Sequence, residues 1–434
     1  MKWTASDINK ALLTNECTYS GENIEFNSSD IKKNDIFIAL PGSKYHGHDF
    51  LNNALDNGAS MSIVESNAFE KNNINVNSTV KALDNLAIYA RDRAKNCIRI
   101  AITGSVGKTT CKEMINHALS KKCKVHKSIK SYNNHVGVPY TLANLPVNSE
   151  VGIFEVGMNK RNEISPLSKL IKPTISIITS IAPAHIENLG SMEEIAREKF
   201  DIVCGMEKNS YLIVNKCGNY KKIIENEIKN LKSKRSDIKI ITIDESTINE
   251  LNSNSDDILN QHINITKCVA DILNIDISNL LNDFSKEKGR GNIEKIIFYG
   301  KDITLVDDSY NANPTSMKYG INNFIKNFPD SSKNIFIIGE MMELGDYQHE
   351  YNKDIIEMIN YISPKFAIFT GNSMKKITNK IDLNFPFYVF ENSKDLILKG
   401  KEILNKHIKE NDIIFAKGSN LTGVNEFVNQ VLKN

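Results

Sequence analysis

Cysteine, arginine and long apolar runs are scarce in this chain, and each shortage excludes a class of protein. The seven cysteines are scattered and form no Cys-X-X-Cys pair. Their odd number and their spacing argue against a disulfide framework or a zinc site and favour a reducing compartment. No stretch reaches the roughly 18 apolar residues of a membrane span, and the N-terminus lacks the apolar core of a secretion signal. We therefore expect a cytoplasmic protein with no membrane span.

An excess of charge of one sign is also lacking, because 54 Lys and Arg residues balance 52 Asp and Glu residues to a net charge of +2. This balance predicts neither a nucleic-acid nor a membrane partner. Only seven of the basic residues are arginines, which makes an arginine within a motif more informative. With 434 residues, of which 41% are hydrophobic, the chain is too long for one core, and we expect two or three domains.

Short apolar runs alternate with helix-like segments along the chain, which predicts an α/β fold with parallel sheets. In the N-terminal part, runs at residues 36–40 and 61–64 precede a helix over about 81–95. Central runs lie at 98–102, 151–156 and 174–179. After residue 296 the runs recur at 303–306, 334–338, 366–370, 387–390 and 413–416, which indicates a separate Rossmann-like domain. Between residues 221 and 257 the chain turns polar, and we expect irregular surface there.

A phosphate-binding loop is indicated directly behind the apolar run 98–102. The residues there are Thr103, Gly104, Ser105, Val106, Gly107, Lys108, Thr109 and Thr110. Glycines let backbone N–H groups turn inward, and the start of the following helix adds positive potential. The lysine of such a loop, here Lys108, reaches the β- and γ-phosphates, and the hydroxyl of Thr109 can bind Mg²⁺. The glycine spacing departs from the usual pattern, so we predict a variant nucleotide site. The alternative is a glycine-rich turn with an incidental lysine.

Further candidates for chemistry lie outside this loop. Glu155 ends a central apolar run, where a carboxylate can hold Mg²⁺ or, alternatively, cap a neighbouring helix. The paired amides of Asn133 and Asn134 can bind a polar ligand or form a turn. His185 follows the third central run, and Lys199 lies in a helical segment. Taken alone, these last two residues would be a hydrogen-bonded loop histidine and a solvated surface lysine.

Taken together, these motifs resemble those of the Mur ligases, the ATP-dependent amide-forming enzymes of peptidoglycan assembly. The resemblance is collinear over nearly the whole chain. It comprises residues 103–110, 131–139, Glu155, 184–185, 198–199, 289–290, 307–314, 339–345 and 417–419. The stretch 307–314, Asp-Asp-Ser-Tyr-Asn-Ala-Asn-Pro, is the most type-specific signature, and the variant phosphate loop is the family's own form.

The resemblance implies a role for each candidate residue. It assigns Mg²⁺ to Thr109 and Glu155, a second Mg²⁺ to His185, and a carbamate to Lys199. Arg290 and Asp308 match positions that contact the γ-phosphate and the ribose. The implied ATP-binding set is Gly104, Ser105, Val106, Gly107, Lys108, Thr109, Thr110, Arg290, Asp308 and Asn313. The implied metal set is Thr109, Glu155, His185 and Lys199, the catalytic set is Lys108, Lys199, His185 and Arg290, and the substrate set is Ser28, Asn133 and Asn134.

The resemblance also implies the domains and the reaction. A UDP-sugar-binding α/β domain would span residues 1–82, a central ATP-binding domain with a parallel sheet of the P-loop ATPase type would span 83–295, and a Rossmann-like domain for the amino substrate would span 296–434. The implied reaction uses ATP and Mg²⁺ to add D-Ala-D-Ala to UDP-MurNAc-tripeptide through an acyl phosphate. The implied partners are these small molecules, and the implied oligomeric state is a monomer. Two alternatives stay open: another amide ligase of the superfamily, of the third-residue-adding or folylpolyglutamate type, and a nucleotide-binding protein that has lost ligase activity.

Three stretches depart from the family pattern. Residues 27–29 read Asn-Ser-Ser in place of Asp-Ser-Arg, and residues 46–48 read His-Gly-His in place of Asp-Gly-His. The stretch 241–262 is short for the extra strands that the family has there, and asparagines near His262 are displaced. We therefore expect adenine to be held less specifically than the phosphates.

Overall fold

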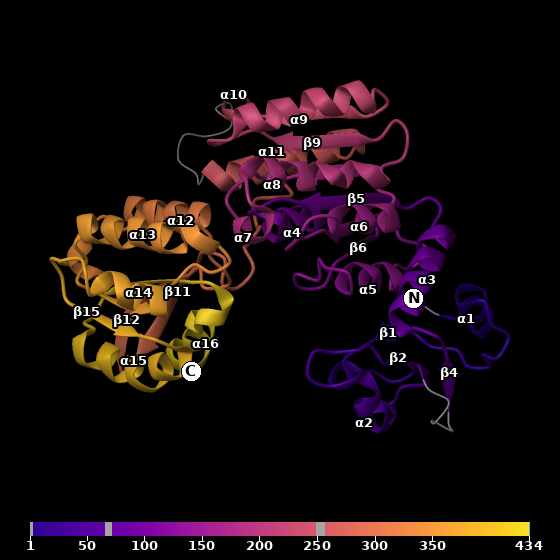
Figure 1. The fold of residues 1–434 in the computed structure, drawn as a ribbon, viewed down its shortest axis with the longest axis horizontal. Coiled ribbons are helices and arrows are strands. Elements are labelled where there is room, and N and C mark those ends of the chain that lie inside the picture. Colours follow the sequence, from indigo (N-terminus) through magenta and orange to yellow (C-terminus); the bar gives the residue numbers. More distant parts are fainter. Residues whose placement is uncertain (1–2, 66–71, 249–256, 434) are drawn as a thin grey trace. The chain divides into compact units, whose positions relative to one another are not determined.

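The computed structural model describes residues 3–65, 72–248 and 257–433, which form helices and three β-sheets (Figure 1). The described residues divide into two compact units. The first holds residues up to 180, 196–248 and 258–282, and the second holds 181–195 and 283–433. Within the described ranges, no helix is long and apolar enough to cross a bilayer.

The N-terminal sheet of the first unit has four parallel strands in the order β1-β2-β3-β4. The strands are β1 (Ile24–Glu25), β2 (Ile36–Ile38), β3 (Met61–Val64) and β4 (Asn73–Asn75), and the helices are α1 (Ala5–Leu12), α2 (Leu51–Asp56) and α3 (Thr79–Arg93). Apolar side chains of β2 and β3 pack against α2 in one small core, which includes Phe37, Leu51 and Val64. The expected strands at 36–40 and 61–64 and the expected helix near 81–95 are therefore confirmed.

The central sheet of the first unit has six parallel strands in the order β10-β9-β8-β5-β7-β6. The strands are β5 (Ile98–Thr103), β6 (Val125–Lys127), β7 (Val151–Glu155), β8 (Ile175–Ile178), β9 (Tyr211–Asn215) and β10 (Lys239–Ile243). The helices are α4 (Lys108–Leu119), α5 (Gly137–Ala143), α6 (Ile164–Ile171), α8 (Met192–Phe200), α9 (Lys221–Lys234), α10 (Glu245–Ile248) and α11 (Asp257–Ile272). Strand order reverses at β5, and ligands of such sheets bind at the carboxyl ends of strands beside this reversal.

The expectation of irregular surface between residues 221 and 257 is wrong for most of that stretch. Helix α9 and strand β10 form there, and only residues 249–256 lie outside the described residues. Three apolar side chains of α9, Ile224, Ile228 and Leu231, recur on one face and are buried. The many lysines and glutamates of α9 occupy its other face, so the average polarity of the segment concealed an amphipathic helix.

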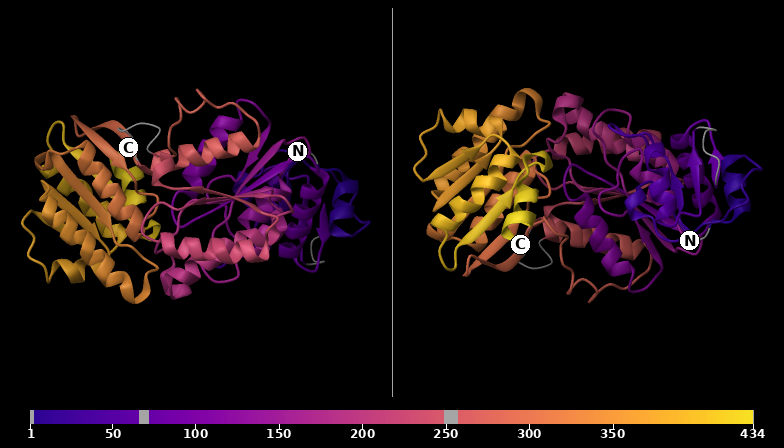
Figure 2. Two further views of the ribbon diagram at one scale, coloured as in Figure 1. Left: turned by 90° about the horizontal axis from the view of Figure 1, so that it is seen from above. Right: turned by 90° about the horizontal axis from the view of Figure 1, so that it is seen from below.

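The second unit holds a six-stranded sheet in the order β11-β12-β16-β13-β14-β15, which is parallel except for the pair β11 and β12. The strands are β11 (Asn292–Phe298), β12 (Lys301–Asp307), β13 (Asn334–Gly339), β14 (Phe366–Thr370), β15 (Phe387–Phe390) and β16 (Ile413–Lys417). The helices α12 (Pro314–Asn327), α13 (Gln348–Ile362), α14 (Asn372–Thr378), α15 (Ser393–His407) and α16 (Val424–Phe427) cover both faces of this sheet (Figure 2). The five strands expected after residue 296 are confirmed, and the unit also includes α7 (Ile186–Leu189).

Candidate nucleotide and metal site

The predicted phosphate loop connects β5 to α4 at the point where the central sheet reverses its strand order. Two glycines have positive φ, +151° at Gly104 and +86° at Gly107. A Cβ at Gly104 would lie 2.0 Å from Thr179 Oγ1, and one at Gly107 would lie 2.4 Å from His262 Nε2. Both the backbone angles and the space therefore require glycine at these positions. Helix α4 starts at Lys108 without a side-chain cap, which suits a helix end that receives an anion.

The loop is braced by the chain that follows β8. The Val106 N–H donates to Ser180 Oγ at 2.8 Å, the Ser105 N–H donates to the Ser180 carbonyl at 3.0 Å, and Thr179 Oγ1 donates to the Val106 carbonyl at 2.6 Å. Lys108 Nζ donates to the Gly104 carbonyl at 2.8 Å, so the lysine arm folds back over the loop. The loop shape is thus fixed by contacts that Thr179 and Ser180 provide.

Thr109 and Glu155 meet at the carboxyl ends of β5 and β7, which are adjacent strands. Thr109 Oγ1 donates to Glu155 Oε2 at 3.0 Å, and Asn133 Nδ2 donates to Glu155 Oε1 at 2.9 Å. Thr109 and Glu155 are 2% and 1% exposed. A buried hydroxyl and carboxylate beside a phosphate loop are the oxygen ligands that Mg²⁺ takes, so the residues present fit this metal. Glu155 therefore contacts Thr109 of α4, the helix that follows the phosphate loop, through a side-chain hydroxyl and not as a backbone cap.

The two asparagines of the 131–139 stretch behave differently. Asn133 touches Glu155, whereas Asn134 Oδ1 accepts hydrogen bonds from the N–H groups of Val136 and Gly137 at 3.1 and 2.9 Å. Asn134 therefore shapes the turn that starts α5. Ser131 Oγ lies 3.3 Å from Thr109 Oγ1, which brings a second hydroxyl to the same place.

Lys199 is buried rather than solvated. It lies on α8 and is 2% exposed. Burial, with the nearby positive charge of Lys108, lowers the pKa of the Lys199 amine well below its usual value, against the opposing charge of Glu198. A lowered pKa favours the neutral, nucleophilic form of this amine. The alternative of a surface lysine is therefore wrong for this position.

Glu198, next to Lys199 in sequence, has a separate role. Its Oε1 accepts from the N–H groups of Glu163 and Ile164 at 3.0 and 2.9 Å, and its Oε2 accepts from the Asn162 N–H at 2.7 Å. These N–H groups lie at the start of α6, which lacks a side-chain cap of its own. Glu198 therefore ties α8 to the beginning of α6.

His185 belongs to the second unit, where it precedes the short helix α7 with a φ of +57°. Its Nδ1 lies 2.6 Å from Oε2 of Glu343, a residue of the 339–345 stretch. This contact lowers the pKa of the Glu343 carboxyl. Sequence reasoning had placed no role on Glu343.

The remaining candidates of the second unit gather near the end of β12. The Arg290 guanidinium lies 4.0 Å from the centre of the Tyr310 ring. Asp308 Oδ2 is paired with Lys417 Nζ at 2.7 Å. Asn313 Oδ1 accepts from the Ser316 N–H at 2.9 Å and caps α12. Lys417 is 2% exposed and Asp308 is partly exposed, so the 307–314 and 417–419 stretches are joined by a half-buried charge pair.

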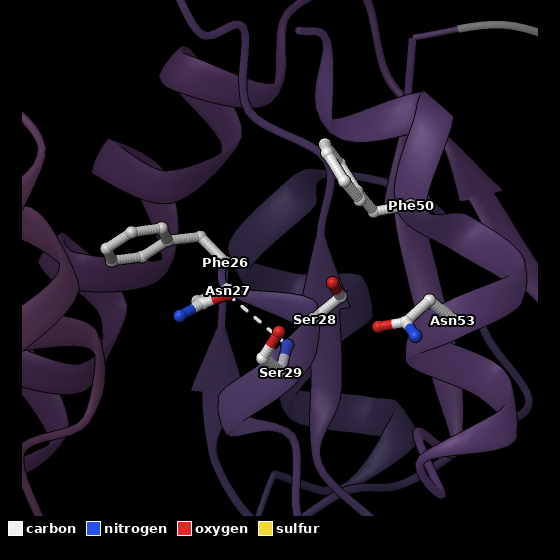
Figure 3. Close-up of a pocket in the computed structure, with 6 residues that line it drawn as sticks. All are labelled: Phe26, Asn27, Ser28, Ser29, Phe50 and Asn53. Atoms are coloured by element: carbon white, nitrogen blue, oxygen red, sulfur yellow. Dashed lines mark hydrogen bonds between the residues drawn. The ribbon is translucent and has the colours of Figure 1, made fainter.

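A pocket of about 450 Å³ lies in the N-terminal sheet region, and its lining includes Ser28. The lining residues are Phe26, Asn27, Ser28, Ser29, Phe50 and Asn53. Figure 3 shows Ser28 below the ring of Phe50, with Asn53 pointing towards Ser28 and the ring of Phe26 to the left. Hydroxyl and amide groups beside aromatic rings suit a ligand that is flat in one part and polar in another.

The departures from the family pattern at this end of the chain form ordered local structure. Asn27 Oδ1 accepts from the Ser29 N–H at 3.2 Å. His46 caps the short helix Gly47–Phe50, since its N–H donates to Asp49 Oδ2 at 3.0 Å and its Nδ1 accepts from the His48 N–H at 3.3 Å. The turn at 46–48 therefore has a capping side chain, that of His46.

An aromatic cluster joins this pocket to the loop that carries Asn133. The ring of Phe26 lies 5.8 Å from that of Tyr132 and 5.0 Å from that of Tyr140, measured between centroids. The Tyr140 hydroxyl donates to Glu25 Oε2 at 2.8 Å, and burial raises the pKa of this phenol. Phe26, which lines the pocket, therefore packs directly against Tyr132, the residue before Asn133.

A glycine-containing loop at the strand reversal of a parallel sheet is typical of nucleotide-binding α/β proteins. The buried oxygens of Thr109 and Glu155 lie beside this loop. Three family descriptions match the chain in order: "Mur ligase family, catalytic domain" over residues 22–102, "Mur ligase middle domain" over 102–278, and "Mur ligase, glutamate ligase domain" over 293–420. The chain belongs to the Mur ligase family.

Individual relatives agree with this membership over the full length. The chain is 34% identical to the UDP-N-acetylmuramoyl-tripeptide–D-alanyl-D-alanine ligase of Rickettsia prowazekii, over 91% of this chain and 92% of that one. A crystal structure of MurF from Acinetobacter baumannii has a TM-score of 0.83 at 21% identity and covers 100% of this chain and 99% of its own. MurF ligase from Thermotoga maritima, solved with ADP, has a TM-score of 0.74 at 21% identity and covers 95% and 97%. These structures support the fold, with three α/β regions in the expected order.

Proposed function

We propose that this chain is an ATP-dependent ligase that adds D-Ala-D-Ala to UDP-MurNAc-tripeptide during the synthesis of peptidoglycan precursors. The observation that carries this proposal is the 34% identity, over nearly the whole of both chains, to a relative of that name. The type-specific stretch 307–314 supports the same substrate pair. The buried oxygens of Thr109 and Glu155 beside the phosphate loop support the use of ATP.

The reaction has two steps. A carboxylate oxygen of the tripeptide attacks the γ-phosphorus of ATP, a new O–P bond forms, and the bond from phosphorus to the β–γ bridging oxygen breaks to release ADP. The amine of D-Ala-D-Ala then attacks the carbonyl carbon of the acyl phosphate, a C–N bond forms, and phosphate leaves as the nitrogen loses a proton. No side chain needs to act as a nucleophile, so the protein contributes position and charge.

Residues of the first unit bind and orient the reacting phosphates. Backbone N–H groups of residues 104–110 and the Lys108 ammonium offset the phosphate charge as two anions approach. Thr109 and Glu155 would hold Mg²⁺, which supplies further positive charge at the phosphates when bound. The 3.0 Å contact between their oxygens supports this pairing.

Lys199 would carry a carbamate. Its neutral amine adds to CO₂, a N–C bond forms and one proton is released, which leaves a carboxylate on a long arm. The burial of Lys199 and its lowered pKa support this step, because only an unprotonated amine reacts with CO₂. By resemblance, this group and His185 would serve a second Mg²⁺.

Nucleotide and sugar contacts complete the proposal. In the second unit we assign ATP contacts to Arg290, Asp308 and Asn313 by resemblance. The pocket at Ser28 would take the UDP-sugar, and Asn133 and Asn134 would belong to the substrate region. The proposed domains are 1–82, 83–295 and 296–434, although the last boundary falls within β11 of the third sheet. The proposed state is a cytoplasmic monomer, which light scattering of the purified chain and cell fractionation can test.

ADP release tests the proposal. We expect ADP to form only when UDP-MurNAc-tripeptide, D-Ala-D-Ala, ATP and Mg²⁺ are all present, and omission of any one should reduce the rate to background. Two other substrate pairs distinguish the related ligases, because a third-residue-adding enzyme would join a diamino acid to UDP-MurNAc-dipeptide and a folylpolyglutamate-type enzyme would join glutamate to a folate. ATP binding without turnover on any pair would show that the chain is a nucleotide-binding protein that has lost ligase activity.

A further inference from the structure

Lys112 is a buried lysine beside the carboxylate to which we assign Mg²⁺. It lies one helical turn after Thr109 on α4, so the two side chains lie on one face of the helix. Its exposed fraction is 0%. A long cationic side chain is seldom fully buried without partners, and the reaction outlined above uses no group at this position.

The Lys112 ammonium is fixed by several oxygens. Nζ donates to the carbonyls of Ser128 and Lys130 at 3.0 and 2.5 Å, and lies 3.2 Å from Glu113 Oε1. Glu113 in turn pairs through its other oxygen with Lys127. These contacts hold the ammonium in one place and tie α4 to the segment that follows β6.

The same ammonium lies 3.7 Å from Glu155 Oε2, the oxygen that accepts the Thr109 hydroxyl. At this distance, and away from water, the positive charge of Lys112 offsets part of the negative charge of Glu155. A divalent cation that approached this oxygen alone would be attracted by Glu155 and repelled by Lys112. The phosphates of a nucleotide supply additional negative charge that Lys112 does not offset.

We propose that Lys112 is a positioning residue whose charge makes the metal site depend on nucleotide. By offsetting the charge of Glu155, it keeps the nucleotide-free protein from retaining Mg²⁺, so the ion is held only together with the nucleotide phosphates. This inference rests on the assignment of Glu155 to Mg²⁺ under the proposed function.

Binding of Mn²⁺, measured by the loss of the free-ion electron paramagnetic resonance signal, tests this role without any turnover. The variants are Lys112→Gln, which keeps a donor and removes the charge, and Lys112→Met, which removes both. Lys127→Met is the matched control, because Lys127 pairs with Glu113 and has no contact with Glu155 among its described contacts. Circular dichroism checks that each variant is folded.

We expect nucleotide-free wild type and Lys127→Met to bind Mn²⁺ equally weakly, and both Lys112 variants to bind it about tenfold more tightly or better. Loss of a merely structural lysine would loosen the site and weaken Mn²⁺ binding, so unchanged or weaker binding in the folded variants overturns the proposal. Wild type alone gives a second test, since Mn²⁺ binding as tight without ADP as with ADP also overturns it. If Mn²⁺ does not increase the affinity of wild type for ADP at all, the metal role of Glu155 fails instead.

Discussion

Removal of the Glu198 carboxylate should destabilise the first unit strongly, although Glu198 has no assigned part in the reaction. This side chain is 4% exposed and accepts hydrogen bonds from the backbone N–H groups of Asn162, Glu163 and Ile164. In Glu198→Ala these donors lose their partner at a helix start where no other side chain caps them.

The magnitude follows from the contacts. A hydrogen bond to a charged group contributes about 1.5–3 kcal/mol, and losing a helix cap costs about 1 kcal/mol. Since the three bonds share one carboxylate, their losses do not add in full, and we expect Glu198→Ala to lower the free energy of unfolding by about 3–5 kcal/mol. Glu198→Gln keeps one oxygen, which can still accept from Glu163 and Ile164, so its loss should be about 1–2 kcal/mol.

Urea unfolding followed by tryptophan fluorescence measures this loss, because Trp3 is the single tryptophan of the chain and is buried in the same unit. Glu193→Ala is the control, since Glu193 is an exposed glutamate of the same helix. Its loss should stay below about 1 kcal/mol. The reasoning is refuted if Glu198→Ala costs no more than Glu193→Ala, because the three hydrogen bonds would then contribute nothing to stability.

Three further predictions concern activity. Lys108→Ala should lower kcat by about 10²-fold or more with an unchanged unfolding midpoint, and a folded variant with more than a few per cent of wild-type activity would remove Lys108 from the reaction. Lys199→Ala should be nearly inactive and partly restored by millimolar short-chain carboxylic acids, whereas an unmodified Lys199 in a crystal with Mg²⁺ and nucleotide bound would contradict the carbamate. GTP should replace ATP with a loss in kcat/KM of about ten- to a hundredfold, the discrimination of one hydrogen bond of roughly 1–3 kcal/mol, and a preference for ATP well above about a thousandfold would disprove the loose adenine site.

The parts that sequence reasoning predicted well are those in which local pattern determines local structure. The phosphate loop was predictable because Gly104 and Gly107 take backbone angles that glycine favours, directly between an apolar strand and a helix. Glu155 was predictable as a neighbour of the loop, because carboxyl ends of parallel strands meet at one edge of the sheet. Strand positions were predictable from apolar runs, because strands of a parallel sheet are buried on both faces.

The parts that sequence reasoning missed depend on packing between distant segments. Lys112 looks like an ordinary surface lysine of a polar helix, and Lys199 was singled out only through the family resemblance. The assembled structure shows that both are buried. Glu198 reaches the start of α6, and Ser180 braces the phosphate loop, and neither contact leaves a signal in the spacing of residues. The segment 221–243 was misjudged because its average polarity was considered before the spacing of its apolar residues.

Mass spectrometry of the reaction product tests the central claim most directly. Purified chain is incubated with UDP-MurNAc-tripeptide, D-Ala-D-Ala, ATP and Mg²⁺, and both the sugar-peptide and the released ADP are quantified. We predict a product whose mass equals that of the two substrates less one water, formed in equal amount to ADP, and formed about 10²-fold more slowly or worse with Lys108→Ala. ADP formation without this condensation product, or the product without consumption of ATP, would contradict the account.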